Sequence, residues 1–176
     1  IRNLIRDTGQ TGFSPSLQSA VVTTLQSAQY GFDPLRNLRF RSSTNVEDAE
    51  QFTGAGLYES FSGCLADDLD SNSSGPSLCD STESNERGVF RAIRRVYASF
   101  YNLNAYLERL RYGVSENQVG MALLVHHSFP DPEELANGVA TLTQGASASS
   151  RSGYQVLQVG ANAVTNPTPG QIPEEV

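Results

Sequence analysis

Two arginines on alternate residues of a strand-like segment are the residues best suited to chemistry in this sequence. Arg39 and Arg41 stand in residues 38–41, and side chains two positions apart on a strand project from the same face. A guanidinium presents a rigid fork of donors that matches phosphate oxygens. The glycines Gly54 and Gly56 follow, and glycine lets backbone N–H groups approach an anion closely. The pattern fits a polyphosphate site, and a strand followed by a surface turn is the simpler alternative.

The string that contains these residues adds a family resemblance. Residues 41–48 read Arg-Ser-Ser-Thr-Asn-Val-Glu-Asp, and residues 52–60 read Phe-Thr-Gly-Ala-Gly-Leu-Tyr-Glu-Ser. In this order they closely resemble the nucleotide-binding domain of the phosphoenolpyruvate synthase, pyruvate phosphate dikinase and glucan water dikinase families. The resemblance covers about residues 39–167. It implies the ATP-binding portion of a longer phosphotransferase, with ATP and Mg²⁺ as cofactors.

The resemblance also implies which residues contact the nucleotide. Arg41 stands where the family has its phosphate-binding arginine. The histidine pair falls on the segment that forms the adenine side of the site, where an imidazole can donate or accept a hydrogen bond. An exposed histidine pair at a strand end is the alternative. The predicted nucleotide-binding set is Arg41, Gly54, Ala55, Gly56, Ser60, His126 and His127, with no catalytic residue and no metal ligand in this chain.

Three departures from the family's active enzymes leave both an active and an inactive protein as alternatives. All twelve basic residues are arginines, so the lysine that the family places on the phosphates has no counterpart. Asn162 stands about where the family has a glutamate that assists magnesium, and an uncharged amide is a poor ligand for that ion. The domain with the acceptor histidine is not expected here either.

These departures leave three functional hypotheses. The first is the ATP-binding part of a dikinase-like phosphotransferase. The second is a catalytically inactive relative with a binding or structural role. The third is an interaction domain for an anionic ligand other than ATP.

Two cysteines indicate the compartment. Cys64 and Cys79 bracket a flexible polar segment, and we favour a disulfide between them over free thiols. A metal site would need four ligands, and the histidines lie elsewhere in the sequence. The disulfide would stabilise the fold by about 3 kcal/mol in the chain-entropy model. A bonded pair would indicate an extracytoplasmic location, whereas an active ATP enzyme is expected in the cytoplasm.

The segment between and after the cysteines is predicted to be an inserted surface loop over residues 64–85, solvated and disordered-looking. Its carboxylate and amide oxygens are of the kind that calcium prefers, but they lack the full spacing and the distal glutamate of an EF-hand loop. A solvated acidic loop is therefore the favoured interpretation. The calcium-ligand candidates are Asp67, Asp68, Asp70 and Asn72.

Charge and composition exclude some classes of partner. The net charge of −7 argues against nucleic acid as a general partner. No apolar run approaches the ~20 residues of a membrane-spanning helix. The 176 residues, 38% of them hydrophobic, are enough for one domain with a core. The expected partners are a nucleotide and the other domains of a longer parent chain.

Hydrophobic periodicity predicts the helices that position the arginines. Residues 1–13 are predicted as an entry strand or arm. Ser14 followed by proline is a preferred helix start, and Gly31 is the predicted end of that helix. The longest periodic segment predicts a helix near residues 86–112, with arginines mostly off its apolar face and a break into two helices marked by Asn102 and Asn104. Arg94 and Arg95 are expected to be solvated.

Short apolar runs separated by turn residues predict the strands. The tail, residues 161–176, is predicted to be irregular because it is rich in proline and glycine. The expected architecture is α+β, a single partial domain over residues 1–176 that resembles part of an ATP-grasp domain, with a mostly antiparallel sheet and one long helix. The predicted strands are residues 38–41, 59–63, 118–129, 137–144 and 154–160.

Overall fold

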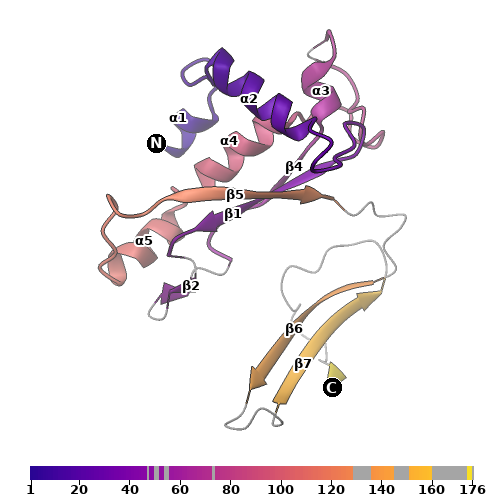
Figure 1. Cartoon of the computed structure of the whole chain (residues 1–176). Coiled ribbons are helices and arrows are strands. Elements are labelled where there is room, and N and C mark those ends of the chain that lie inside the picture. Colours follow the sequence, from indigo (N-terminus) through magenta and orange to yellow (C-terminus); the bar gives the residue numbers. More distant parts are fainter. Residues whose placement is uncertain are drawn as a thin grey trace. The chain divides into compact units, whose positions relative to one another are not determined.

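The computed structural model describes residues 1–46, 48–49, 52–53, 56–72, 74–128, 136–144, 151–159 and 174–175. The chain divides into two compact units, Ile1–Ser128 and Phe129–Val176, and each is described by itself. The first unit combines helices with a three-stranded antiparallel sheet, so the predicted α+β class is confirmed (Figure 1).

The sheet of the first unit has the strand order β4–β1–β5. Its central strand pairs antiparallel with β4 over three residues and with β5 over its full length, in a register that places Leu38 opposite His127. The central strand alternates buried and more exposed residues, as expected for an antiparallel sheet with one face packed on the core. The strands are β1 Leu38–Thr44, β4 Phe61–Gly63 and β5 Met121–His127.

One face of this sheet carries the core. Leu38 and Phe40 are 0% and 1% exposed. They pack against helices α2 (Pro15–Leu25) and α4 (Val89–Ser99), which lie on the same side of the sheet (Figure 1). Each fully buried side chain of this size contributes about 1.5–3 kcal/mol of hydrophobic stabilisation. The remaining buried members of the cluster are Leu25, Leu65, Val89, Ala92, Ile93 and Val96.

Helix α2, Pro15–Leu25, begins where the sequence predicts and ends earlier. The Ser14 hydroxyl accepts a hydrogen bond from the Leu17 N–H at 3.3 Å, which caps the first turn. After Leu25 the Ser27 hydroxyl accepts from the Gln29 N–H, and such local bonds compete with the helix. Gly31, the predicted end, instead supplies a turn with φ of 63°.

The N-terminal segment also differs from the prediction. Residues Arg2–Arg6 form the short helix α1 in place of an entry strand or arm. This helix packs on α4, where Arg94 Nη1 donates to the carbonyl oxygens of Ile5 and Thr11 at 3.0 and 2.7 Å. Arg94, predicted to be solvated, therefore ties the N-terminal segment to the body of the unit.

The predicted long helix is divided into α4, Val89–Ser99, and α5, Leu103–Arg111. The break falls at Asn102, where the backbone turns to an extended conformation with ψ of 140°. The Asn102 amide group donates to Glu59 Oε1 at 3.0 Å, a bond from outside the helix that favours this turn. The last turn of α4 tightens before the break, with N–H groups bonded three residues back.

The insert predicted as a solvated loop is ordered in large part. Cys64 and Cys79 are joined by a disulfide, as predicted, and helix α3 spans Leu65–Leu69. Asp67 is 5% exposed, and its carboxylate accepts from the N–H groups of Leu78 and Arg87, both at 2.8 Å. This carboxylate fastens the insert to the chain that follows it, so it is a structural group.

Asp68 closes the other side of the insert. Its carboxylate accepts from the N–H groups of Val89 and Phe90, the first turn of α4, where a helix favours negative charge. The same carboxylate occupies the space that a side chain on Gly88 would need. Within the described residues no group of three or more metal-binding side chains gathers, so the predicted calcium alternative gains no support.

The second unit is a β-hairpin extended by a short strand. Strand β6 spans Ala136–Gln144 and pairs antiparallel with β7, Arg151–Val159, which confirms both predicted strands. Strand β8, Glu174–Glu175, pairs with β7 inside the tail predicted to be irregular. Asn162 lies outside the described residues.

No helix in the part of the chain that the structure describes has the length and apolarity to cross a bilayer.

Candidate nucleotide-binding site

The face of the sheet opposite the core carries Arg41 and His126 of the predicted set, together with Arg39. Arg39 and Arg41 both project from it, because they alternate with the buried residues of β1. Cross-strand partners in a sheet share a face. The partners of Arg39 are Ser62 on β4 and His126 on β5, and the partner of Arg41 is Leu124. We call this surface the open face.

The two arginines of the open face differ in burial. Arg41 is exposed, whereas Arg39 is half-buried and its Nη1 donates to the Ser62 hydroxyl at 3.3 Å. Burial, and then the neighbouring charge of Arg41, lowers the pKa of Arg39 below its usual value. Neither arginine forms an ion pair among the residues described. Two adjacent cations without a counter-charge favour an anionic ligand.

The predicted histidine pair is divided between the two faces. His126 lies on the open face, and its Nδ1 donates to the His127 carbonyl oxygen at 2.7 Å, so Nε2 is the ring nitrogen left for a ligand. His127 lies on the opposite face, where its Nε2 accepts from the Asp33 N–H at 3.2 Å and its ring packs edge-on against Phe32. His126 is therefore placed to contact a ligand beside Arg39, and His127 holds the turn before β1.

The glycine loop is described only in part. Gly54 and Ala55 lie outside the described residues, and Gly56 adopts φ of 80°, a left-handed conformation that favours glycine. Ser60 is half-buried just before β4. Between them, the Glu59 N–H donates to the Ser99 hydroxyl at 3.0 Å, which anchors the end of the loop to α4.

The segments on either side of Gly54 and Ala55 have different supports. Strands β2, Asp48–Ala49, and β3, Phe52–Thr53, form a small antiparallel hairpin before them. After them, the Tyr58 ring stacks on Phe100 with centroids 6.0 Å apart. The glycines thus link a hairpin to a segment fixed on the helices.

Arg109 is a supporting residue that the sequence pattern did not reveal. The arginines of the predicted helix were expected to lie mostly off its apolar face, yet the side chain of Arg109 has no exposed surface. Its Nε and Nη2 donate to the two carboxylate oxygens of Glu116 at 2.6 and 3.1 Å, and its guanidinium lies 4.0 Å from the centre of the Phe100 ring. Arg109 thereby fixes the ring on which Tyr58 rests.

The charge of Arg109 is stabilised by its partners. Burial disfavours the charged form, but the hydrogen bonds with Glu116 and Tyr58 outweigh it and hold the pKa of Arg109 above its usual value. The turn after α5 brings Glu116 within reach, through a bond from the Val114 N–H to the Arg109 carbonyl oxygen at 2.9 Å. The only indication of this pair in the sequence is that Glu116 follows Arg109 by seven residues, just after the predicted helix.

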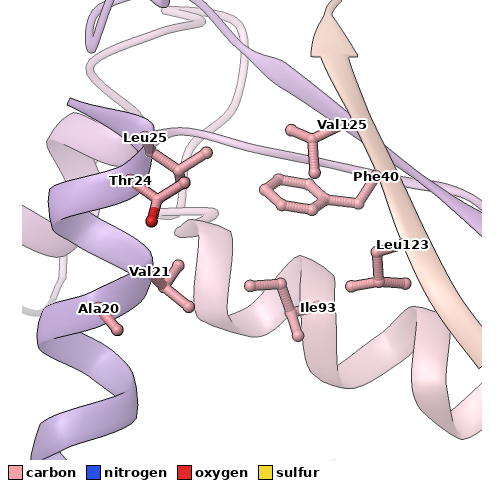
Figure 2. Close-up of a pocket in the computed structure, with 8 residues that line it drawn as sticks. All are labelled: Ala20, Val21, Thr24, Leu25, Phe40, Ile93, Leu123 and Val125. Carbon is pink, nitrogen blue, oxygen red and sulfur yellow. The ribbon is translucent and has the colours of Figure 1, made fainter. Parts of the chain in front are cut away.

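A second candidate region lies on the core side of the sheet. A hollow of about 280 Å³ opens between α2 and the buried face, lined by apolar side chains such as Val21, Phe40 and Leu123 (Figure 2). The hydroxyl of Thr24 is its one polar side-chain group among the lining residues. Such a lining does not suit a charged ligand, because nothing in it offsets the loss of hydration.

The first unit is an α+β fold that presents two arginines on one face of a strand. The sequence model of the family described as pyruvate phosphate dikinase, AMP/ATP-binding domain, matches residues 1–158, and the chain belongs to this family. No curated protein matches the sequence. The family match confirms the predicted resemblance, and it supports a nucleotide as the ligand.

Proposed function

We propose that this chain binds the phosphates of ATP on the open face, as the nucleotide-binding portion of a phosphoenolpyruvate synthase- or pyruvate phosphate dikinase-like phosphotransferase. The observation that carries the proposal is the pair Arg39 and Arg41, which has no ion-pair partner within the described residues. Membership in an AMP/ATP-binding family supports ATP as the anion. In this proposal the domain has an ATP-grasp-like arrangement.

Each predicted residue has a defined task in the proposal. Arg41 donates its fork to phosphate oxygens, and the amides of residues 53–57 add backbone donors around the same phosphates. The free Nε2 of His126 accepts a hydrogen bond from the edge of the base, and the hydroxyl of Ser60 supplements the phosphate contacts. His127 acts indirectly, because its ring fixes the turn at Asp33.

The work of the protein in such a reaction is to position and stabilise charge. Phosphoryl transfer needs the γ-phosphate held in line with its acceptor, and fixed cations offset the charge that spreads over its oxygens. The acceptor would be a histidine on another domain of a longer chain. Mg²⁺ would accompany the ATP, but the described residues offer no carboxylate cluster for it, so no step is assigned to the metal here.

A second candidate function is a relative that retains nucleotide binding or the fold without catalysis. The absence of lysine among the twelve basic residues favours it, because an ammonium on the phosphates is part of the family's chemistry. The disulfide between Cys64 and Cys79 favours it too, since such bonds persist in oxidising compartments. Under either candidate we expect the isolated chain to have no phosphotransfer activity.

Calorimetric titration of ATP with Mg²⁺ into the wild type and Arg41→Lys tests the proposal. Lysine keeps the charge of Arg41 and loses its planar fork, so we expect a ten- to hundredfold weaker Kd, or about 1.5–3 kcal/mol. Arg111→Lys is the matched control, because Arg111 is an exposed arginine on α5. Equal affinity in the wild type and Arg41→Lys removes Arg41 from the site.

The same titration separates the two candidates. A wild-type chain that binds no nucleotide, alone or within a longer parent chain, contradicts the ATP proposal and favours a structural role. Binding with no phosphoryl transfer by the parent chain favours the inactive relative.

A further inference from the structure

We propose that Arg39 is a second phosphate-binding arginine, and that it makes the open face selective for ligands with two or more linked phosphates over monophosphates. The inference rests on the proposed function and adds a specificity-determining residue to it. The family resemblance assigns phosphate binding to Arg41 and leaves Arg39 without a role.

The electrostatic state of Arg39 is the first support. Its guanidinium is half-buried, it stands two residues from a second cation on the same face, and both effects disfavour its charge. Among the residues described, no carboxylate offsets them. A bound anion would offset this unfavourable interaction.

A comparison within the same unit shows what is particular to Arg39. Arg91 on α4 is also partly desolvated and repelled by other arginines, but the nearby charge of Glu83 opposes that effect. Arg95 has Glu59 in the same role. Arg39 has no such acidic neighbour among the groups that set its pKa. Of these three partly buried arginines, Arg39 is therefore the best suited to an external anion.

The orientation of Arg39 is the second support. Its Nη1 donates to the Ser62 hydroxyl, and that hydroxyl is hydrogen-bonded to the Ser128 hydroxyl, with 3.3 Å in each contact. Arg36 Nε in turn donates to the Ser128 carbonyl oxygen at 3.2 Å. The chain of bonds restrains the Arg39 head at the β4 side of the open face. A restrained head loses less conformational entropy when it binds a ligand.

The spacing of the two arginines gives the selectivity. Residues two apart on a strand are separated by about 6.6 Å, and both guanidiniums project from one face. A guanidinium has five N–H donors, of which Arg39 uses one in the bond to Ser62. Two linked phosphates can then bind one guanidinium each, whereas a single phosphate is bound by one guanidinium and leaves the other without an anion. A nucleoside diphosphate or triphosphate fits this pair better than a monophosphate.

The test is a calorimetric comparison of AMP, ADP, ATP and inorganic pyrophosphate with four proteins: the wild type, Arg39→Gln, Ser62→Ala and the charge-matched control Arg91→Gln. We expect Arg39→Gln to weaken the affinity for ADP, ATP and pyrophosphate about tenfold and to change the affinity for AMP by less than about twofold. Ser62→Ala keeps the charge and loses the restraint, so a smaller loss in the same direction is expected. Far-UV circular dichroism and thermal midpoints verify that each variant folds.

The outcomes of this inference and of the proposed function are distinguishable. If Arg39→Gln and Arg91→Gln bind ATP with the same affinity, the role of Arg39 is overturned. This holds even where Arg41→Lys still binds ATP more weakly than the wild type. An equal loss for AMP and ATP overturns the selectivity. Pyrophosphate binding that depends on Arg39, with no nucleotide bound by the wild type, supports this inference and overturns the ATP proposal. Should Arg39→Gln not fold, Ser62→Ala without any change in pyrophosphate affinity overturns the inference.

Discussion

Replacing Glu116 by glutamine is expected to destabilise the first unit by about 2 kcal/mol. The change keeps the shape of the side chain and removes the carboxylate that pairs with the buried guanidinium of Arg109. Breaking a fully buried ion pair from one side costs about 3–5 kcal/mol, because a charge remains buried without its partner. Glu116 is 37% exposed, so water screens part of the pair and the smaller figure applies.

The reverse change has a different origin of cost. Arg109→Met leaves Glu116 free to turn to water, but it removes the donor to the Phe100 carbonyl oxygen at 3.0 Å and the cation over the Phe100 ring. An unsatisfied buried carbonyl costs about 1–3 kcal/mol. The double variant, Glu116→Gln with Arg109→Met, leaves neither charge without its partner. Its loss in free energy of unfolding should therefore be smaller than the sum of the two single losses, by at least about 1 kcal/mol.

Urea unfolding followed by circular dichroism measures these free energies, and the chain has no tryptophan to follow by fluorescence. Glu108→Gln is the control, because Glu108 pairs with the exposed Arg111 at 3.5 Å and should change stability by less than about 0.5 kcal/mol. The reasoning is refuted if Glu116→Gln is as mild as Glu108→Gln, or if the two single costs add fully.

Two further predictions concern the insert. The unfolded, unreduced protein should contain close to zero titratable thiols, and Cys64→Ala with Cys79→Ala should lower the free energy of unfolding by about 3 kcal/mol; two free thiols contradict this. Burial, which outweighs the hydrogen bonds from the first turn of α4, raises the pKa of Asp68 from 3.8 to about 6. Because the folded carboxyl then holds its proton more tightly than the unfolded one, the stability should fall as the pH rises from 4 to 6. Asp68 is exposed, so water screens the effect and the expected fall is about 1 kcal/mol. Asp68→Asn should remove that fall, and a stability difference between the two proteins that does not vary with pH would count against it.

Features set by neighbouring residues were predictable from the sequence. Strand β1 was readable from the alternation around Phe40, and the start of α2 from Ser14 and its following proline. The cysteine pair was readable from the polar segment it encloses. In each case the signal and the structure lie within a few residues or one short loop, so local physics determines the outcome.

Features set by distant partners were not predictable in the same way. The sequence indicated a break in the long helix at Asn102, but it did not reveal the bond from Asn102 to Glu59, which lies far away in the sequence. Asp67 is a structural group because backbone amides of Leu78 and Arg87 reach it. Periodicity places a side chain on a face of its own element, but it does not say which distant polar group meets that face.

For the histidine pair, a local rule could have narrowed the prediction that both residues contact the nucleotide. Neighbouring residues on a strand point to opposite faces, so His126 and His127 in β5 cannot both line one surface. Alternation alone selects the residue on the face of Arg39, and the register with β1 identifies it as His126. Only one of the two histidines is then available to a ligand on the open face.

The close fit between Asp68 and Gly88 has an evolutionary consequence. A methyl group at position 88 would overlap the Asp68 carboxylate, and that carboxylate already receives the N–H groups at the start of α4. Either residue alone is therefore hard to change, while a joint replacement remains open. Across related sequences, positions 68 and 88 should vary together, with a side chain at 88 found where 68 is small and supplies no carboxylate.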